Sequence, residues 1–356
     1  MTNAPKRLAR DPLNSALWPV PADHFLTPAA DFFTRSHAPT PTIDRDTWRL
    51  EVTGLVDRSA SFTFEELVGS FPRHEVMATM VCAGLRRDEF LSIGPLPGEL
   101  PWGPEPASNG HWAGIRLRDV LQRVGVSRPA KYVEFIGLDR VERHGEIFGF
   151  GGSIDLQKAL SSEVLLATEL NGEPLPPDHG FPLRSVVPGW IGARSVKWLG
   201  RIVLSEHPSH NYFQTKAYRF QRTTNPNDIR DVTSGFALSE LPLNAVILSP
   251  TRDEVIPAGP VTVRGWAMGA AGRELRSIEV SPNAGRDWYS ARVAVAPDEW
   301  SWTFWEAELD LVPGAHVLAA RASDCSGATQ PAAVGDMWNV KGYSNNAWHL
   351  IPVRAE

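Results

Sequence analysis

The sharpest constraint on the fold is a change of sequence pattern near residue 240. Beyond that point, short segments alternate apolar and polar residues, are rich in Val and Trp, and are separated by Gly, Pro and Asn turns. These segments are residues 243–248, 261–266, 276–280, 288–295, 300–309 and 316–322. Evenly spaced short strands of this kind are typical of a β-sandwich. We therefore expect a sandwich domain over residues 241–356, after the polar stretch 222–231.

The preceding part of the chain mixes helical and strand patterns. Residues 48–54, 76–81 and 132–136 alternate like strands, whereas residues 116–124 and 156–170 carry apolar residues at helical spacing. Thr63 and Glu66 form a capping-box pattern before a short helix that ends near Gly69. Because no regular strand–helix–strand rhythm is present, we expect an α+β domain over residues 48–240.

Residues 1–47 form a third segment with a different composition. The first 41 residues contain seven prolines and little periodicity. Proline fixes φ and removes a backbone donor, so we expect an extended arm that packs on the domain that follows it. Arg35 and His37 are unusual in such an arm.

Charge and composition exclude several classes of protein. The 356 residues include 35 Lys and Arg against 41 Asp and Glu, a net charge of −6, so no nucleic acid partner is expected. No apolar run approaches the ~18 residues that span a bilayer. Residues 1–11 lack the apolar core of a secretory signal, which predicts a cytoplasmic protein, or a periplasmic one if an export leader was removed. Cys82 and Cys325 are too few for a disulfide framework.

Cys82 is the first candidate functional residue. It follows an apolar strand pattern and opens the sequence Cys82-Ala-Gly-Leu-Arg-Arg87. The small residues let the backbone approach a ligand, and two adjacent guanidinium groups oppose the charge of a thiolate. Cys82 is therefore a candidate metal ligand or nucleophile. The alternative is a buried, inert cysteine followed by two solvated arginines.

The second candidate is a basic segment between His179 and Ser205. It contains four Arg or Lys residues and no acid, surrounded by apolar and glycine residues. A partly buried arginine without a partner costs several kcal/mol, about the amount that an opposite charge nearby returns. The segment therefore predicts a bound anion, for which phosphate suits the guanidinium fork. The alternative is a basic surface turn paired with Glu169 or Glu173.

A set of short motifs runs in one order along nearly the whole chain. The motifs include Phe33-Thr-Arg-Ser-His37, Cys82-Ala-Gly-Leu-Arg-Arg87, Asn109-Gly-His-Trp-Ala-Gly114, Leu117-Arg-Asp-Val-Leu121, Gly137-Leu-Asp139, Leu170-Asn-Gly-Glu-Pro-Leu175, Asp178-His-Gly-Phe-Pro-Leu-Arg184, Gly192-Ala-Arg-Ser-Val-Lys-Trp198, Trp338-Asn-Val-Lys-Gly342 and Asn346-Ala-Trp-His349. This ordered set resembles the sulfite oxidase family of molybdenum enzymes. Each motif alone is weak, but their common order is specific.

The resemblance implies a molybdopterin-binding domain followed by an immunoglobulin-like β-sandwich that forms a homodimer. In such proteins one protein thiolate binds the molybdenum, and here this residue is Cys82, a soft ligand. The expected anion becomes the pterin phosphate, held by His179, Arg184 and Lys197. The other cofactor-binding residues that the resemblance implies are His37, Asp139, Arg194 and Ser195.

The resemblance also implies a pocket that oxidises sulfite, a small oxyanion, to sulfate. Its residues are Arg35, Arg87, Trp102 and Tyr218. The two arginines bind the oxyanion electrostatically, and Tyr218 matches a family tyrosine that couples proton and electron movement. Electrons are expected to pass to a separate acceptor, a cytochrome. No haem is expected in this chain, which carries neither a C-x-x-C-H motif nor a cytochrome b5-like segment before residue 40.

Two positions depart from the family pattern and leave the substrate open. The family commonly has Asn where Leu85 stands, and many sulfite-oxidising members have Arg where Leu350 stands. A lost positive charge weakens the binding of a dianion, so sulfane sulfur, an S-oxide and nitrate are alternatives. Two other classes compete with these: a cofactor-free hydrolase or transferase with Cys82 as nucleophile, and an adhesion protein built on the Trp-rich sandwich.

Overall fold

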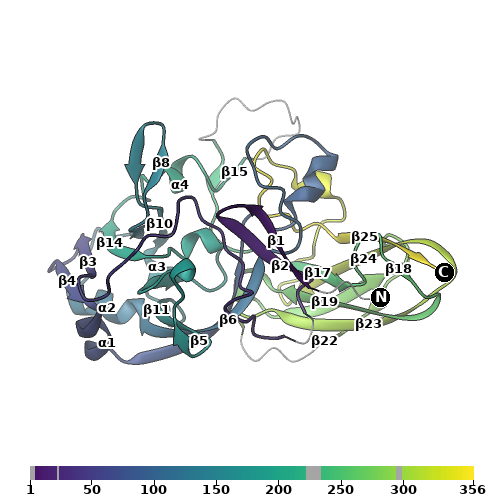
Figure 1. Cartoon of the computed structure of the whole chain (residues 1–356), viewed down its shortest axis with the longest axis horizontal. Coiled ribbons are helices and arrows are strands. Elements are labelled where there is room, and N and C mark those ends of the chain that lie inside the picture. Colours follow the sequence, from purple (N-terminus) through teal and green to yellow (C-terminus); the bar gives the residue numbers. More distant parts are fainter. Residues whose placement is uncertain (1–4, 22–23, 222–233, 294–298) are drawn as a thin grey trace.

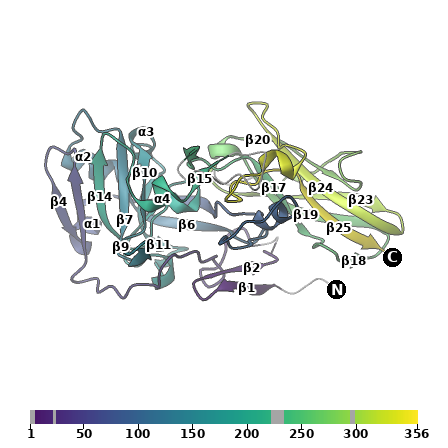
Figure 2. The same ribbon diagram turned by 90° about the horizontal axis from the view of Figure 1, so that it is seen from above.

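The computed structural model describes residues 5–21, 24–221, 234–293 and 299–356 of the chain. Figures 1 and 2 show an elongated molecule, with a mixed domain at one end and a domain built almost entirely of strands at the other. The polar stretch 222–231 and the end of the predicted strand 288–295 lie outside the described residues. Within the described part, no helix is both long and apolar enough to cross a bilayer.

The N-terminal arm is more ordered than its prolines predict. Strands β1 (Lys6–Asp11) and β2 (Asn14–Trp18) form an antiparallel hairpin. Its Ser15 makes a β-bridge with Thr34, which places the hairpin beside the segment that precedes Arg35. In both views the hairpin lies near the junction of the two ends of the molecule (Figures 1 and 2). The arm thus contains a hairpin that the proline content did not predict, in which two residues reverse the chain between β1 and β2.

Two sheets dominate the first domain. One has the order β10 (Gly151–Asp155), β7 (Tyr132–Gly137), β14 (Leu199–Ser205), β3 (Arg49–Gly54) and β4 (Ala60–Thr63). The other has the order β12 (Glu173–Pro174), β11 (Leu165–Leu170), β6 (Ala107–Arg116) and β5 (Arg73–Val81), with β13 (Arg184–Val186) paired to β11. Small ladders join β8 (Val141–Arg143) to β9 (Glu146–Phe148) and β15 (Arg219–Phe220) to β16 (Phe236–Ala237). The strands predicted at 48–54, 76–81 and 132–136 are confirmed.

Helices in this domain are short and few. The α-helices are α1 (Phe64–Ser70), α2 (Leu117–Val124), α3 (Leu156–Ala159) and α4 (Tyr212–Thr215). The 3-10 helices among the described residues of both domains are η1 (Arg87–Ser92), η2 (Pro177–His179), η3 (Gly192–Arg194), η4 (Ala270–Gly272) and η5 (Val334–Met337). The capping box predicted at Thr63 and Glu66 is present at the start of α1. The helix predicted over 156–170 is wrong, because only its first turn is helical and β11 follows.

A hydrophobic core holds the first domain together. It includes Leu50, Leu121 and Phe135, which come from β3, α2 and β7 and are fully buried. The helix α2 packs its apolar stripe against this core, as its spacing predicts.

Two further sheets make up the C-terminal domain. Their orders are β17 (Asn244–Ser249), β19 (Gly259–Met268), β23 (Thr303–Leu311), β22 (Arg292–Val293), and β18 (Val255–Ile256), β25 (His349–Ala355), β24 (Gly314–Asp324), β20 (Leu275–Ser281), β21 (Tyr289–Ser290). One apolar core contains residues of both sheets, including Val263, Trp305, Val280 and Leu318. Five of the six predicted strands are found, whereas the described part of 288–295 is divided between β21 and β22, which belong to different sheets. The strands β18 and β25 were not predicted from the pattern.

The two domains share a second apolar core at their junction. It contains Val81 at the end of β5 and Ala83 and Leu85 from the loop that follows, together with Trp266 and Trp302 from the C-terminal domain. The loop around Cys82 is therefore supported from behind by the second domain.

Arg86 adds a polar joint at the same place. This fully buried side chain forms an ion pair with Glu89 and donates to Asn244 Oδ1 at 3.0 Å and to the carbonyl oxygens of Ala347 and Trp348 at 2.9 Å. One sequence-based interpretation placed Arg86 in solvent, and the other directed it at the Cys82 thiolate. Both are wrong, because its guanidinium is buried and bonded to these acceptors. It ties the loop to the C-terminal domain instead.

Candidate active site

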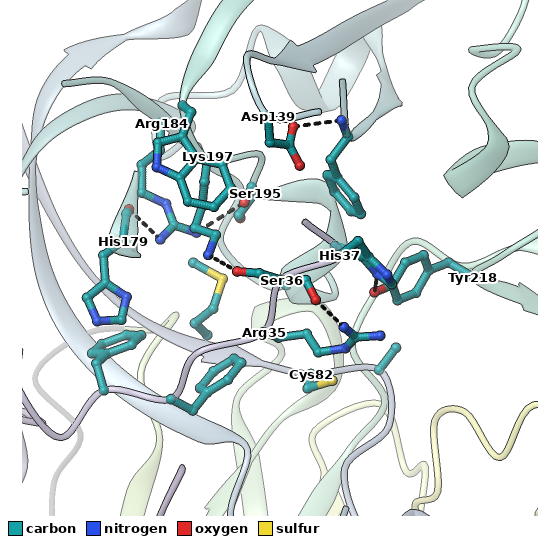
Figure 3. Close-up of a pocket in the computed structure, with 18 residues that line it drawn as sticks. Arg35, Ser36, His37, Cys82, Asp139, His179, Arg184, Ser195, Lys197 and Tyr218 are labelled. Carbon is teal, nitrogen blue, oxygen red and sulfur yellow. Dashed lines mark hydrogen bonds between the residues drawn. The ribbon is translucent and has the colours of Figure 1, made fainter. Parts of the chain in front are cut away.

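One cavity collects most of the predicted site residues (Figure 3). They come from the N-terminal arm, the end of β5, the loop after β7 and the segment 179–198. The predicted residues that line it are Arg35, His37, Cys82, Asp139, His179, Arg184, Ser195, Lys197 and Tyr218. The sequence analysis did not assign roles to the other lining residues, which are Phe32, Phe33, Ser36, Met80, Ala83, Phe150, Gly192, Ala193 and Trp198.

Cys82 supplies a sulfur to this cavity directly after β5 ends. The backbone N–H of Gly84 donates to its Sγ at 3.4 Å, and its own N–H bonds to the carbonyl oxygen of Pro106. Its side chain is buried, with 7% of the residue exposed. A buried sulfur that accepts an N–H and faces a cavity suits a soft metal ligand better than an inert packing role.

Arg35, His37 and Tyr218 lie near the thiol in Figure 3. Arg35 Nη1 donates to the carbonyl oxygen of Ser36 at 2.6 Å and to Asn14 Oδ1 at 3.2 Å. His37 Nε2 lies 2.9 Å from the Tyr218 hydroxyl. Burial raises the pKa of Tyr218 to about 12 and, together with Arg35, holds the pKa of His37 well below its usual value. The two therefore form a hydrogen bond between a protonated phenol and a neutral imidazole.

Arg184, Lys197 and His179 lie at the other side of the cavity (Figure 3). Arg184 donates to the carbonyl oxygens of His179 and Ser195, both at 3.0 Å. Lys197 Nζ donates to Ser36 Oγ at 2.7 Å and to the carbonyl oxygen of Asp178 at 2.8 Å. Among the described residues, no carboxylate forms an ion pair with Arg184 or Lys197.

Burial leaves these cations short of countercharge. It lowers the pKa of Arg184 to about 9 and, with Arg184 adding to it, the pKa of Lys197 to about 7. The pKa of His179 falls to about 3, chiefly through burial and then through Arg184. Glu169 is paired with Arg73, so the interpretation as a basic surface turn is wrong. An anion placed here would restore the balance of charge.

Asp139 adds an acceptor to the cavity wall. Its Oδ1 accepts the Phe150 N–H at 2.8 Å, and burial raises its pKa. A nearly buried carboxyl beside an open space can accept N–H donors from a bound ring. A sulfur, a cationic anion site and an acceptor thus share one cavity. These residues fit a molybdopterin cofactor, whose metal Cys82 would hold and whose phosphate Arg184 and Lys197 would hold.

Three predicted site residues lie outside the cavity wall, namely Arg87, Trp102 and Arg194. Arg87 forms an ion pair with Glu99 at 3.4 Å and donates to carbonyl oxygens of Leu100 and Gly342. Trp102 is fully buried in the apolar cluster that includes Cys82. Arg194, also fully buried, donates to the carbonyl oxygens of Leu238 and Phe213 at 3.1 Å. Their proposed roles stay predictions.

Lys341 and Glu99 were not singled out from the sequence. Lys341 Nζ pairs with Glu99 at 2.9 Å, and Glu99 also pairs with Arg87, so one carboxylate faces two cations. Tyr343 joins this group to the cavity, because its ring stacks on Tyr218 and lies under the Arg87 guanidinium. Lys341 belongs to the motif at 338–342, which is the one signal that could have drawn attention to it.

The two departures from the family pattern lie away from the cavity. Leu350 is on β25 opposite Ala319, is 36% exposed and does not line the cavity. Leu85 lines a smaller cavity of about 350 Å³ on the side of Cys82 that faces the C-terminal domain. The expectation that Leu350 removes a charge from this pocket is wrong.

Comparison with known proteins supports the class that the site defines. A family profile described as an oxidoreductase molybdopterin binding domain matches residues 37–213, and one described as a Mo-co oxidoreductase dimerisation domain matches residues 236–356. The fold and the site therefore define a molybdopterin oxidoreductase.

Similar proteins narrow this class. The chain is 38% identical to sulfite oxidase of Gallus gallus over 92% of this chain and 73% of that protein. It is 36% identical to the mitochondrial sulfite oxidase of Homo sapiens and to an inducible NADH nitrate reductase of Glycine max, of which it spans 62% and 39%. It also matches the crystal structure of the sulfane dehydrogenase SoxCD from Paracoccus pantotrophus, with a TM-score of 0.80 and 25% identity over 99% of this chain and 90% of that chain.

The chain belongs to the sulfite oxidase family. It is a molybdopterin-dependent oxidoreductase of the sulfite oxidase type. This membership sets aside the cofactor-free hydrolase or transferase and the adhesion protein as alternatives.

Proposed function

We propose that this protein oxidises sulfite to sulfate and passes two electrons to a separate acceptor, a cytochrome. The reaction consumes one water and releases two protons with the two electrons. One observation carries the proposal: a single cavity holds the Cys82 sulfur beside Arg35 and Tyr218, with the cations of the segment 179–197 across from them. When bound, the molybdenum cofactor supplies oxygen-atom transfer and the redox change.

The residues of the chain have separate tasks in this proposal. Cys82 holds the metal as a thiolate, while Arg184 and Lys197, oriented by backbone carbonyl oxygens, hold the pterin phosphate through charge. His179 is neutral, since its pKa is lowered to about 3, and contacts the phosphate without a charge of its own. His37 and Asp139 hold the pterin from the facing wall. These residues orient the cofactor before any substrate arrives.

Arg35 and Tyr218 face the substrate. The Arg35 guanidinium binds the oxygens of an anion by charge-assisted hydrogen bonds. The Tyr218 hydroxyl keeps its proton at neutral pH because its pKa is raised to about 12 by burial, so it can donate to a substrate or product oxygen. Arg87 lies over the Tyr343 ring, which stacks on Tyr218. From there Arg87 adds positive potential to the pocket, which Glu99 partly offsets.

This offset favours a second candidate substrate of lower charge. Glu99 faces both Arg87 and Lys341, which reduces the field available to a dianion. A sulfane sulfur, an S-oxide or nitrate carries less charge than sulfite. The similarity to a sulfane dehydrogenase and to a nitrate reductase supports this candidate.

The C-terminal domain completes the proposal. We propose that residues 241–356 form an immunoglobulin-like sandwich and that residues 48–240 are the catalytic domain. The match to a dimerisation domain supports a homodimer formed through the sandwich.

Elemental analysis combined with turnover on the same preparation tests the function. Protein from a host that makes molybdopterin is expected to carry about one molybdenum per chain and to reduce cytochrome c or ferricyanide with sulfite. A cysteine persulfide peptide is assayed beside it as an electron donor, and an organic S-oxide and nitrate are assayed as electron acceptors with reduced methyl viologen. A molybdenum-loaded protein that turns over one of these faster than sulfite favours the second candidate, and a protein without molybdenum contradicts both.

A further inference from the structure

Asn14 connects the N-terminal hairpin to the substrate side of the cavity. It is the first residue of β2 and only 3% exposed. Its Oδ1 accepts two hydrogen bonds, from Arg35 Nη1 at 3.2 Å and from the Ser36 N–H at 2.8 Å. The molybdopterin-binding profile begins at residue 37, so Asn14 lies outside the matched region.

The orientation of the Asn14 amide is fixed from both sides. Its Nδ2 donates to both carboxylate oxygens of Asp11, at 2.7 and 2.8 Å. The Ser36 N–H can only donate and the Asp11 carboxylate can only accept, so a flipped amide would lose all of these bonds. The Asn14 oxygen therefore points permanently at Arg35 and Ser36.

Backbone pairing reinforces this placement. Ser15 and Thr34 exchange two hydrogen bonds, of 3.1 and 2.8 Å, on the residues next to Asn14 and Arg35. The hairpin thus fixes the backbone of the arm at Thr34, and Asn14 fixes the side chain of Arg35.

The rest of the Arg35 guanidinium stays open for a ligand. Its Nη1 is used by Asn14 and by the Ser36 carbonyl oxygen, while no described residue accepts from its Nε or Nη2. A cation fixed at one nitrogen and open at the others can bind an oxyanion without a cost for ordering a long side chain.

We propose that Asn14 is a positioning residue that fixes Arg35 for the binding of a small oxyanion. The inference rests on the proposed function, in which Arg35 contacts the substrate. Ser36 extends the connection, because its hydroxyl accepts from Lys197 on the phosphate side. One hairpin side chain thus sets the place of both the substrate cation and a contact to the cofactor site.

Sulfate binding by the molybdenum-loaded enzyme tests the proposal. We expect Asn14→Leu to raise the Kd for sulfate, measured by titration calorimetry, about tenfold, and to raise KM for sulfite similarly with kcat changed less than twofold. Molybdenum content is expected to stay near one per chain, since Arg184 and Lys197 keep their backbone acceptors. Asn14→Ala, a smaller change, is measured in parallel in case the leucine disturbs the hairpin.

A double-mutant cycle separates positioning from a general effect on the fold. In an Arg35→Gln background the same Asn14 substitution should change the sulfate Kd less than twofold, because the residue on which it acts is gone. Arg7→Met is the matched control, since Arg7 docks the same hairpin through the Phe32 carbonyl oxygen without touching Arg35. It should leave the sulfate Kd unchanged.

Three results would overturn the proposal: equal effects of Asn14→Leu in both backgrounds, an equal effect of Arg7→Met, or wild-type enzyme that binds no sulfate. Failure of the proposed function would give a different set of results. An enzyme that turns over no sulfite but still shows the Arg35-dependent effect on sulfate binding supports the role of Asn14 and rejects sulfite as the substrate.

Discussion

At the level of single residues, the cavity keeps its sulfur apart from the buried cations Arg184 and Lys197. Cys82 lies with Arg35 and Tyr218, whereas Arg184 and Lys197 lie across the open space (Figure 3). The cations are satisfied by carbonyl oxygens rather than by carboxylates. Carbonyl oxygens orient a cation without cancelling its charge, so the site remains ready for an anion.

Replacing the sulfur tests the ligand role of Cys82. We expect Cys82→Ser to retain pterin but to lose turnover by more than about a hundredfold, because a hydroxyl is a harder and less acidic ligand than a thiol. Pterin fluorescence, elemental analysis and steady-state assays measure this. Cys325→Ser is the control, since that thiol is exposed in the C-terminal domain, and should keep full activity. An active Cys82→Ser enzyme contradicts the ligand role.

The buried lysine predicts how pH acts on the cofactor-free protein. Burial lowers the pKa of Lys197 from 10.5 to about 7, so the folded protein binds fewer protons than the unfolded chain between those values. Stability should therefore rise with pH across about 7 to 10.5, and the burial penalty is fully present below about pH 7.

Protein expressed in a host without molybdopterin allows the measurement. The melting temperature of wild type, taken relative to Lys197→Met, should increase from pH 7 to pH 9. His179 gives the same sign at lower pH, between its folded pKa of about 3 and its usual 6.5. A difference between the two proteins that does not change with pH would show that Lys197 is not buried as a charged group.

At the level of elements, local signals predicted some structures and failed for others. The capping box at Thr63 and the apolar stripe of α2 are short-range patterns, and both were found as predicted. Residues 156–170 show where such patterns fail. Helical spacing there continues into β11, whose Leu165, Leu166 and Ala167 are buried because β11 lies between β6 and β13. A run that is apolar on both faces cannot be distinguished from a helix by periodicity alone.

The capping box gives a prediction at this scale. Thr63→Ala removes the acceptor for the Glu66 N–H at 3.0 Å and should lower the free energy of unfolding by about 1 kcal/mol, with sulfite turnover unchanged. Glu66→Gln keeps an oxygen for the Thr63 N–H and should cost less. Urea unfolding measures both. A Thr63→Ala enzyme as stable as wild type would contradict the stabilising role of the cap.

The sequence motifs predicted which residues belong to the site, but not how their side chains are oriented. Cys82, Arg184 and Lys197 were placed together through motifs far apart in the chain, and the structure brings them to one cavity. Arg87 does not line this cavity, which its motif could not tell, because sequence does not say which way a loop side chain points. It turns toward Glu99, a residue with no motif of its own.

At the level of the whole molecule, the two domains are joined by buried polar contacts as well as by apolar packing. Arg86 is fully buried and reaches Glu89 in its own domain and three acceptors in the other. Removing such a side chain leaves the Glu89 carboxylate without its cation and removes a donor from the Trp348 and Ala347 carbonyl oxygens and from the Asn244 amide oxygen.

Arg86→Met should therefore lower the free energy of unfolding by about 3–5 kcal/mol. Chemical denaturation of the full chain measures this, and Arg118→Met, a partly exposed pair with Asp119, is expected to change stability by less than about 0.5 kcal/mol. A loss for Arg86→Met no larger than for this control would mean that the joint contributes nothing to the fold.

The shared core behind Cys82 limits how this enzyme can be rebuilt from parts. Val81, Ala83 and Leu85 flank the thiol in sequence, yet they pack against Trp266 and Trp302 of the other domain. Exchanging the C-terminal domain for that of a relative would thus change the side chains against which the loop around Cys82 packs. A chimaera must therefore take Trp266 and Trp302 from the same protein as the loop around Cys82. Joining two proteins near residue 240, where the sequence pattern changes, would separate these residues.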